Sequence, residues 1–130
     1  MRFKQPDRKK AQSLFEAAKK DLEFTSTLPP SEASASTIIR NIYEAFRMLG
    51  EALLVADGKE AEGHDEMIKE LLKLKVKTTR PIMVIDNLRQ LRHNINYYGY
   101  RPSKAEAEDA ISIAKACFVP LLEGVKTRVR

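Results

Sequence analysis

One stretch in the first half of this 130-residue sequence decides the fold, because its apolar side chains recur with the period of an α-helix and cover a broad arc. The stretch reads Ile38-Ile39-Arg40-Asn41-Ile42-Tyr43-Glu44-Ala45-Phe46-Arg47-Met48-Leu49-Gly50. A helix with so wide an apolar arc must bury most of its surface against other elements. We therefore expect this helix to be central and to end at Asp57-Gly58, where glycine suits a left-handed cap.

Helical periodicity continues on both sides of this stretch, and no pattern typical of strands is present. The sequence predicts five helices, over residues 7–24, from the 31–36 capping region to 57, 64–75, 81–98 and 104–125. Pro81 opens the fourth helix, Gly99 ends it, and Ser103 with Glu106 forms a capping box that begins the fifth. Residues 74–79 are expected to be a linker. Short connections favour an all-α, antiparallel up-and-down bundle of four to five helices, forming a single domain over residues 1–130.

Composition narrows the class of protein further. With 43% hydrophobic residues, a chain of this length can bury a core without disulfides or a metal. The one cysteine, Cys117, lies in an apolar helical stripe and is expected to be a core residue. The sequence has neither a membrane-spanning apolar run nor a signal peptide, so we expect a cytoplasmic protein. The net charge of +5 favours an anionic partner.

The residue types exclude most enzymatic chemistry. Di-iron sites in helical bundles need Glu-x-x-His pairs, but the residues three before His64 and His93 are Ala61 and Gln90. The sequence contains no Gly-rich phosphate loop, Ser-His-Asp set or pair of carboxylates at catalytic spacing. We therefore expect no metal and no cofactor, and we interpret His64 as a surface or capping histidine.

The fourth predicted helix carries an arginine where a core residue is expected. Its apolar face consists of Val84, Ile85, Leu88, Leu91, Ile95 and Tyr98. Arg92 lies inside this arc, and Arg89 and Asn96 lie along its edge. Because an unpaired buried guanidinium is unfavourable, Arg92 needs either a carboxylate from a neighbouring helix or a site that is open to a ligand. The residues alone leave both explanations open.

The helix order, the stretch 38–50, the stretch Leu91-Arg92-His93-Asn94-Ile95-Asn96-Tyr97-Tyr98-Gly99-Tyr100 and the alanine-rich last helix together resemble the HEPN family. The resemblance covers roughly residues 11–125. HEPN proteins are small helical proteins of prokaryotes, often encoded beside a minimal nucleotidyltransferase as a toxin and antitoxin pair. The resemblance implies a homodimer whose two helix-four motifs face each other across a cleft and, in active members, cut RNA without a metal.

The active motif of that family is an arginine, four to six variable residues and a histidine. Arg92 matches the arginine, but Tyr97, Tyr98 and Gly99 occupy the histidine positions. A tyrosine, with a pKa near 10, is a poor base at neutral pH. Arg92 still offers a bidentate fork for a phosphate. The resemblance therefore favours anion binding over catalysis.

Three functions follow from these patterns. The favoured one is a HEPN-type module that binds RNA, a nucleotide or a partner nucleotidyltransferase through Arg89, Arg92, Asn96, Tyr98 and Tyr100. The alternative is a metal-independent RNase toxin that uses Arg92 with Tyr97 or His93. The third is a helical adaptor without an anion site.

Overall fold

The computed structural model describes residues 2–130 and confirms the predicted all-α class. Its helices are α1 (Arg8–Thr25), α2 (Ala35–Ala56), α3 (His64–Leu72), α4 (Ile85–Tyr98) and α5 (Lys104–Val129). A 3₁₀ turn, η1 (Ile82–Val84), leads directly into α4. No helix in this part of the chain is both long and apolar enough to cross a membrane.

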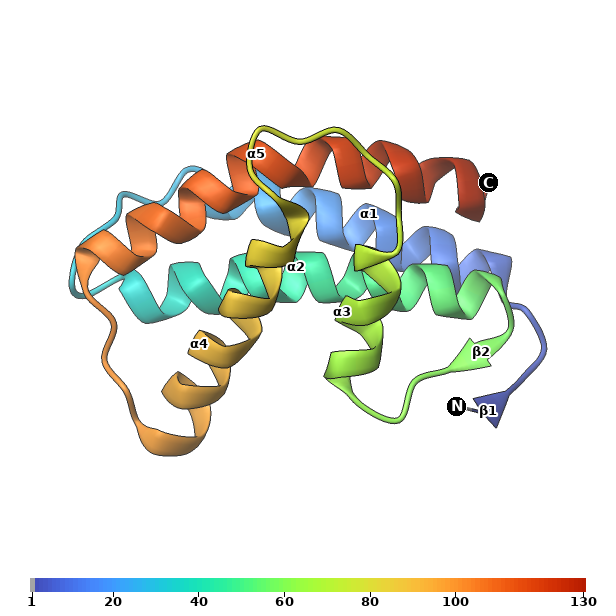
Figure 1. The fold of residues 1–130 in the computed structure, drawn as a ribbon, viewed down its shortest axis with the longest axis horizontal. Coiled ribbons are helices and arrows are strands. Elements are labelled where there is room, and N and C mark those ends of the chain that lie inside the picture. The colour runs from blue at the N-terminus through green and yellow to red at the C-terminus, as the bar shows by residue number, and fades with distance from the viewer. Residues whose placement is uncertain (1) are drawn as a thin grey trace.

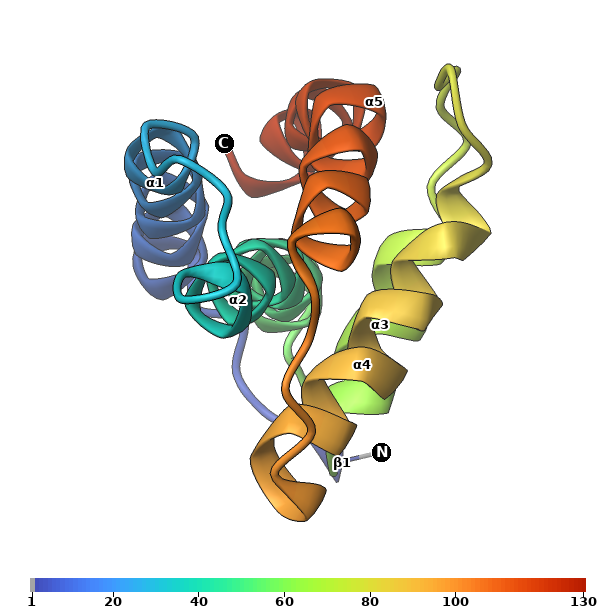
Figure 2. The same cartoon turned by 90° about the vertical axis from the view of Figure 1, so that its left-hand side faces the viewer.

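Helix α2 is the centre of the fold, as its apolar arc predicts, because each of the other four α-helices packs on it. The helices α1, α2 and α5 lie lengthwise, with α5 running in the same direction as α2 and α1 in the opposite direction (Figure 1). The helices α3 and α4 cross α2 instead of following the long axis. Figure 2 shows α1 and α4 on opposite sides of α2.

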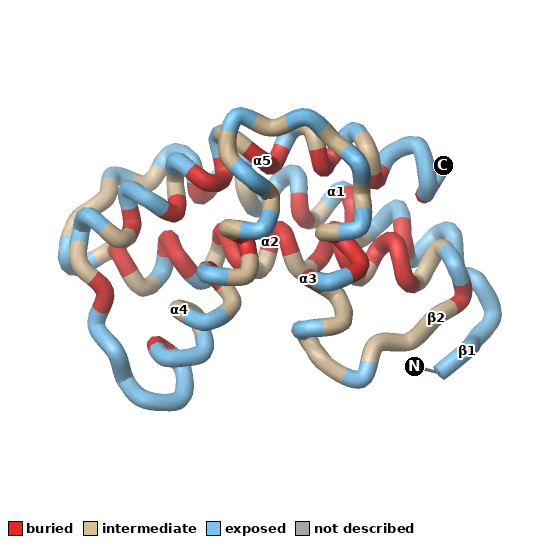
Figure 3. Tube along the Cα trace, in the orientation of Figure 1, coloured by how far each residue is buried: buried red, intermediate tan, exposed pale blue. Residues whose placement is uncertain are grey.

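The core follows the length of α2 (Figure 3). Its largest fully buried side chains are Tyr43, Phe46, Ile38, Ile39, Ile42, Leu49, Leu53, Leu54, Ile68, Leu71, Ile85 and Ile113, and most of them come from α2. The rings of Phe46 and Phe118 meet edge to face with their centroids 5.5 Å apart, which joins α2 to α5. Cys117 is buried, in agreement with the prediction that it belongs to the core.

The predicted helix ends are confirmed at several points. Asp57 is the C-cap of α2, and Gly58 follows it with a φ of 71°. Gly99 ends α4 with a φ of 66°, in the left-handed region that favours glycine. The capping box of Ser103 and Glu106 begins α5.

Two predictions on secondary structure are wrong. The third helix ends at Leu72 instead of residue 75. The residues that follow alternate between half-buried and exposed side chains, as in an extended chain. Leu74 and Val76 thereby come close to Gly124 of α5. The structure also contains two short antiparallel strands, β1 (Arg2–Phe3) and β2 (Lys59–Glu60), which are too short to produce a strand pattern in the sequence.

Candidate functional site

Arg92 lies at the contact between α4 and α2, where its guanidinium carbon is 5.5 Å from the centroid of the Tyr43 ring. This geometry is that of a cation–π contact. The side chain is half-buried, and within residues 2–130 it forms no ion pair and no hydrogen bond. Of the two explanations that the sequence left open, a carboxylate partner from this part of the chain is therefore not the one observed.

The arginines beside Arg92 have carboxylate partners. Arg47 bonds to Glu44 and, at 2.8 Å, to Glu51. Burial opposes the charge of Arg47, yet these two carboxylates hold the pKa of the guanidinium above its ordinary value. The Nε of Arg89 donates to Asp86 at 2.8 Å. Arg92 consequently differs from its neighbours in having its guanidinium fork available to an external anion.

The hydroxyl of Tyr43 is the second unusual group at this contact. The tyrosine is only 1% exposed, and its hydroxyl has no hydrogen-bond partner among the described residues. Burial raises the pKa of Tyr43, and the positive charge of Arg92 opposes that shift, so the group is protonated near neutral pH. Leaving a buried hydroxyl unpaired costs about 1–3 kcal/mol, and such groups are uncommon in folded proteins. The site therefore holds an unused hydrogen-bond donor.

His64 is the third member of this cluster, which the sequence analysis missed by interpreting this histidine as a surface or capping residue. It is the first residue of α3 and is half-buried, with its ring centroid 6.0 Å from that of Tyr43. Burial, followed by the charges of Arg47 and Arg92, lowers the pKa of His64. The imidazole is therefore largely neutral at pH 7.

Gly50 is the sequence signal that explains how α3 comes so close. A Cβ at this position would lie 2.0 Å from the backbone oxygen of Met67, so only glycine permits this approach of α2 and α3. A glycine inside an otherwise apolar helix indicates a close backbone contact, but the sequence does not say with which segment. The proximity of His64 to Tyr43 depends on that contact.

The other predicted site residues on α4 lie apart from this cluster. His93 is exposed, and its ring lies against those of Tyr97 and Tyr98, with centroid distances of 4.7 Å and 5.7 Å. Asn96 is exposed as well, and its side-chain oxygen accepts a 3.4 Å hydrogen bond from Arg40. The structure thus brings Arg92 and Arg89 toward Tyr43 but groups the imidazole and phenol side chains of the motif at the exposed end of α4.

Tyr100 has a separate partner after the end of α4. Its hydroxyl donates to Glu106 of the α5 capping box at 2.7 Å. This hydrogen bond raises the pKa of Tyr100, whose side chain is exposed. Tyr100 thereby ties the end of the motif to the beginning of α5.

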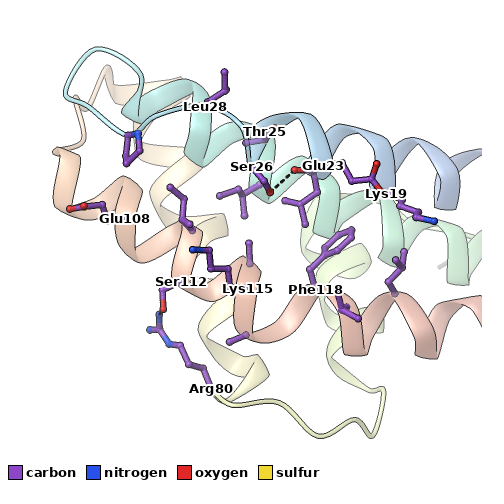
Figure 4. Close-up of a pocket in the computed structure, with 18 of the residues that line it drawn as sticks. Lys19, Glu23, Thr25, Ser26, Leu28, Arg80, Glu108, Ser112, Lys115 and Phe118 are labelled. Carbon is purple, nitrogen blue, oxygen red and sulfur yellow. Dashed lines mark hydrogen bonds between the residues drawn. The ribbon is translucent and has the colours of Figure 1, made fainter.

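A concave region lies between α1 and α5, away from this cluster (Figure 4). It is a cavity of about 980 Å³ whose wall includes Leu22, Ile111 and Phe118, with Lys19 and Lys115 at the same opening. None of the site residues predicted from the sequence lines it. Within residues 2–130, no group of three or more His, Cys, Asp or Glu side chains is placed to hold a metal ion.

Comparison of the chain with family models, with curated proteins and with solved structures gives no match. The cluster of Arg92, Tyr43 and His64, together with the paired arginines around it, is therefore the basis for the function proposed below. The term "arginine cluster" is used for Tyr43, Arg47, His64, Arg89 and Arg92.

Proposed function

We propose that this protein is a HEPN-type module that binds a phosphate group of RNA or of a nucleotide through Arg92. The observation that carries the proposal is that Arg92 has no carboxylate partner in residues 2–130, whereas Arg47 and Arg89 beside it are paired. A half-buried guanidinium in this state binds an anion more strongly than a solvated lysine does, because less water is displaced. The net charge of +5 attracts the same class of ligand.

The test is RNA binding by fluorescence anisotropy at several salt concentrations. We expect Arg92→Ala to weaken binding by about 1–3 kcal/mol, the scale of a lost charged hydrogen bond. Arg8→Ala is the matched control, because Arg8 is exposed near the start of α1. Equal losses from the two substitutions would mean that only the overall positive charge attracts RNA, and would refute a specific role for Arg92.

We also propose, from the HEPN resemblance, that the protein is a cytoplasmic homodimer of a prokaryotic toxin-antitoxin system with a minimal nucleotidyltransferase as its partner. The support from the structure is the exposed aromatic surface at the end of α4, where Tyr97 and Tyr98 are 67% and 77% exposed. Tyrosines of this kind are enriched at protein interfaces. Light scattering at micromolar concentration should report a dimer, and a monomer at high concentration would contradict this assembly.

A second candidate function is metal-independent RNA cleavage, which the position of His64 favours. Its lowered pKa leaves an imidazole able to accept a proton near neutral pH. In this reaction the ribose 2′-oxygen attacks the adjacent phosphorus, His64 takes the 2′ proton, and the leaving 5′-oxygen takes a proton from water. The test is digestion of a fluorescent RNA in the presence of a chelator. Cleavage lost in His64→Asn but kept in His93→Asn would support this candidate, and no wild-type cleavage would refute it.

A further inference from the structure

We infer that the arginine cluster recognises a terminal phosphate monoester, with the Tyr43 hydroxyl as the donor that distinguishes it from an internal phosphodiester. This inference rests on the phosphate-binding function proposed above. It concerns which phosphate binds, and it adds a residue of α2 that lies outside the α4 motif.

The Tyr43 hydroxyl is a hydrogen-bond donor that an anion could satisfy. The hydroxyl is buried, it is protonated near neutral pH, and it has no partner in residues 2–130. Arg92 lies over the ring that carries this hydroxyl, and it is a cation without a counterion in the same part of the chain. A hydrogen-bond donor and an unpaired cation at one ring match an anionic oxygen acceptor, and binding one would satisfy both groups.

The burial of this hydroxyl favours a terminal phosphate over an internal one. Arg92 lies over the ring of Tyr43 and His64 lies at its side, and both of these side chains are half-buried. The hydroxyl itself is buried, since Tyr43 is only 1% exposed. An internal phosphodiester carries a nucleotide on each side, and both would have to be accommodated beside this buried group. A terminal phosphate has one ester bond, so its free oxygens can enter first while the rest of the ligand stays outside.

The charges around Tyr43 agree with this choice. Arg47 and Arg89 flank Tyr43 closely enough to influence its pKa, and both are held in place by carboxylates, Arg47 by two and Arg89 by one. A terminal phosphate carries about −1.5 to −2 charges at pH 7, more than the single charge of a diester. The carboxylates offset the charges of Arg47 and Arg89, so the attraction comes mainly from the unpaired Arg92. A doubly charged phosphate gains more from this cation than a diester does.

The experiment compares binding of one RNA decamer, internally labelled with a fluorophore, in three forms: without a terminal phosphate, with a 5′-phosphate and with a 3′-phosphate. We expect wild-type protein to bind a phosphorylated form about tenfold more tightly than the unphosphorylated form, which is the scale of one charge-assisted hydrogen bond. Tyr43→Phe should abolish this preference, so that the three forms of the RNA bind to this variant with equal affinity. Competition with adenosine 5′-monophosphate identifies the source of the phosphate, since effective competition indicates a free nucleotide and weak competition an RNA end.

Folding is not expected to obscure the result, because Tyr43→Phe removes an unpaired hydroxyl and keeps the ring under Arg92. Urea unfolding of this variant should show no loss of stability. Thr25→Val is the matched control: it removes a buried hydroxyl on α1 that bonds to Asp21, away from the arginine cluster, and should keep the preference.

The outcomes separate the two proposals. Equal affinity for all three RNA forms, combined with a loss in Arg92→Ala, would overturn the terminal-phosphate inference and leave the phosphate-binding function standing. A preference that survives Tyr43→Phe would overturn the role of the hydroxyl. Binding that does not depend on Arg92 in any form would overturn both.

Discussion

The three lengthwise helices and the crossing pair contribute differently to this molecule. Helix α2, between α1 and α5, buries residues around most of its circumference, whereas α4 buries only Ile85, Leu88 and Ile95. The remaining surface of α4 carries arginines, amides and tyrosines. The comparison shows that α1, α2 and α5 supply most of the buried core, while α3 and α4 place polar groups against its edge. The arginine cluster lies where these two regions meet.

The largest expected effect is on stability, from a substitution in the lengthwise bundle. Phe46→Ala removes a fully buried ring that packs on Phe118, and the free energy of unfolding should fall by about 3–5 kcal/mol. Urea unfolding followed by circular dichroism measures this loss. Phe24→Ala is the control, because Phe24 is 65% exposed on α1 and its removal should change stability by less than about 0.5 kcal/mol. Similar losses from both would mean that the bundle is not the stable part of the fold.

A smaller effect is expected where the crossing pair meets the bundle. In Gly50→Ala the new methyl group would meet the backbone of Met67, so α3 must move away from α2. We expect a loss of about 1–3 kcal/mol, as for other overpacked contacts, together with weaker phosphate binding, since His64 moves with α3. Unfolding curves and anisotropy titrations of the same preparation measure both quantities.

Gly124→Ala is the control for that substitution. A Cβ at Gly124 of α5 would lie 3.4 Å from Leu74 and Val76, at the close limit of ordinary van der Waals contact. Alanine also favours the helix by up to about 1 kcal/mol over glycine. Stability should therefore be kept or slightly raised, with binding unchanged. Loss of binding in this variant would show that the site depends on the whole fold and not on the contact of α2 with α3.

The smallest expected effect is a difference in stability between variants of two arginines of the arginine cluster. Arg47→Met leaves Glu44 and Glu51 without their partner and should lower stability by about 1–2 kcal/mol, less than for a fully buried pair because Glu44 is 42% exposed. Arg92→Met removes a cation that has no such partner, and stability should change by less than about 1 kcal/mol. Urea unfolding of both variants tests this order, and the reverse order would show that Arg92 is a structural residue.

Much of the fold could be predicted from the sequence because it depends on local signals. Gly58, Gly99 and the capping box of Ser103 fix the helix ends beside them within a residue or two. The crossing direction of α3 and α4 could not be predicted, since it depends on how side chains on two helices interlock. The linker predicted for residues 74–79 is present, and only the end of the third helix was placed too late, because the few apolar residues there fit either period.

The candidate site could be predicted only in part. Arg92 was recognisable because a charged residue inside an apolar arc violates a local pattern. The roles of Tyr43 and His64 were not recognisable, since a tyrosine in an apolar helix resembles an ordinary core residue and a histidine at a helix start resembles a cap. The proximity of Tyr43 to His64 depends on packing between α2 and α3, and Gly50 is the one local signal of that packing in the sequence.

The order of the helices along the chain has a consequence for folding during synthesis. Helices α1 and α2 are neighbours in sequence and can pair as soon as both have left the ribosome. The face of α2 that includes Phe46 is covered by α5, a helix of 26 residues that is made much later. Until α5 emerges, this apolar face is exposed to other chains and to chaperones, so the most stabilising surface of the finished molecule is also the main aggregation hazard of the nascent one.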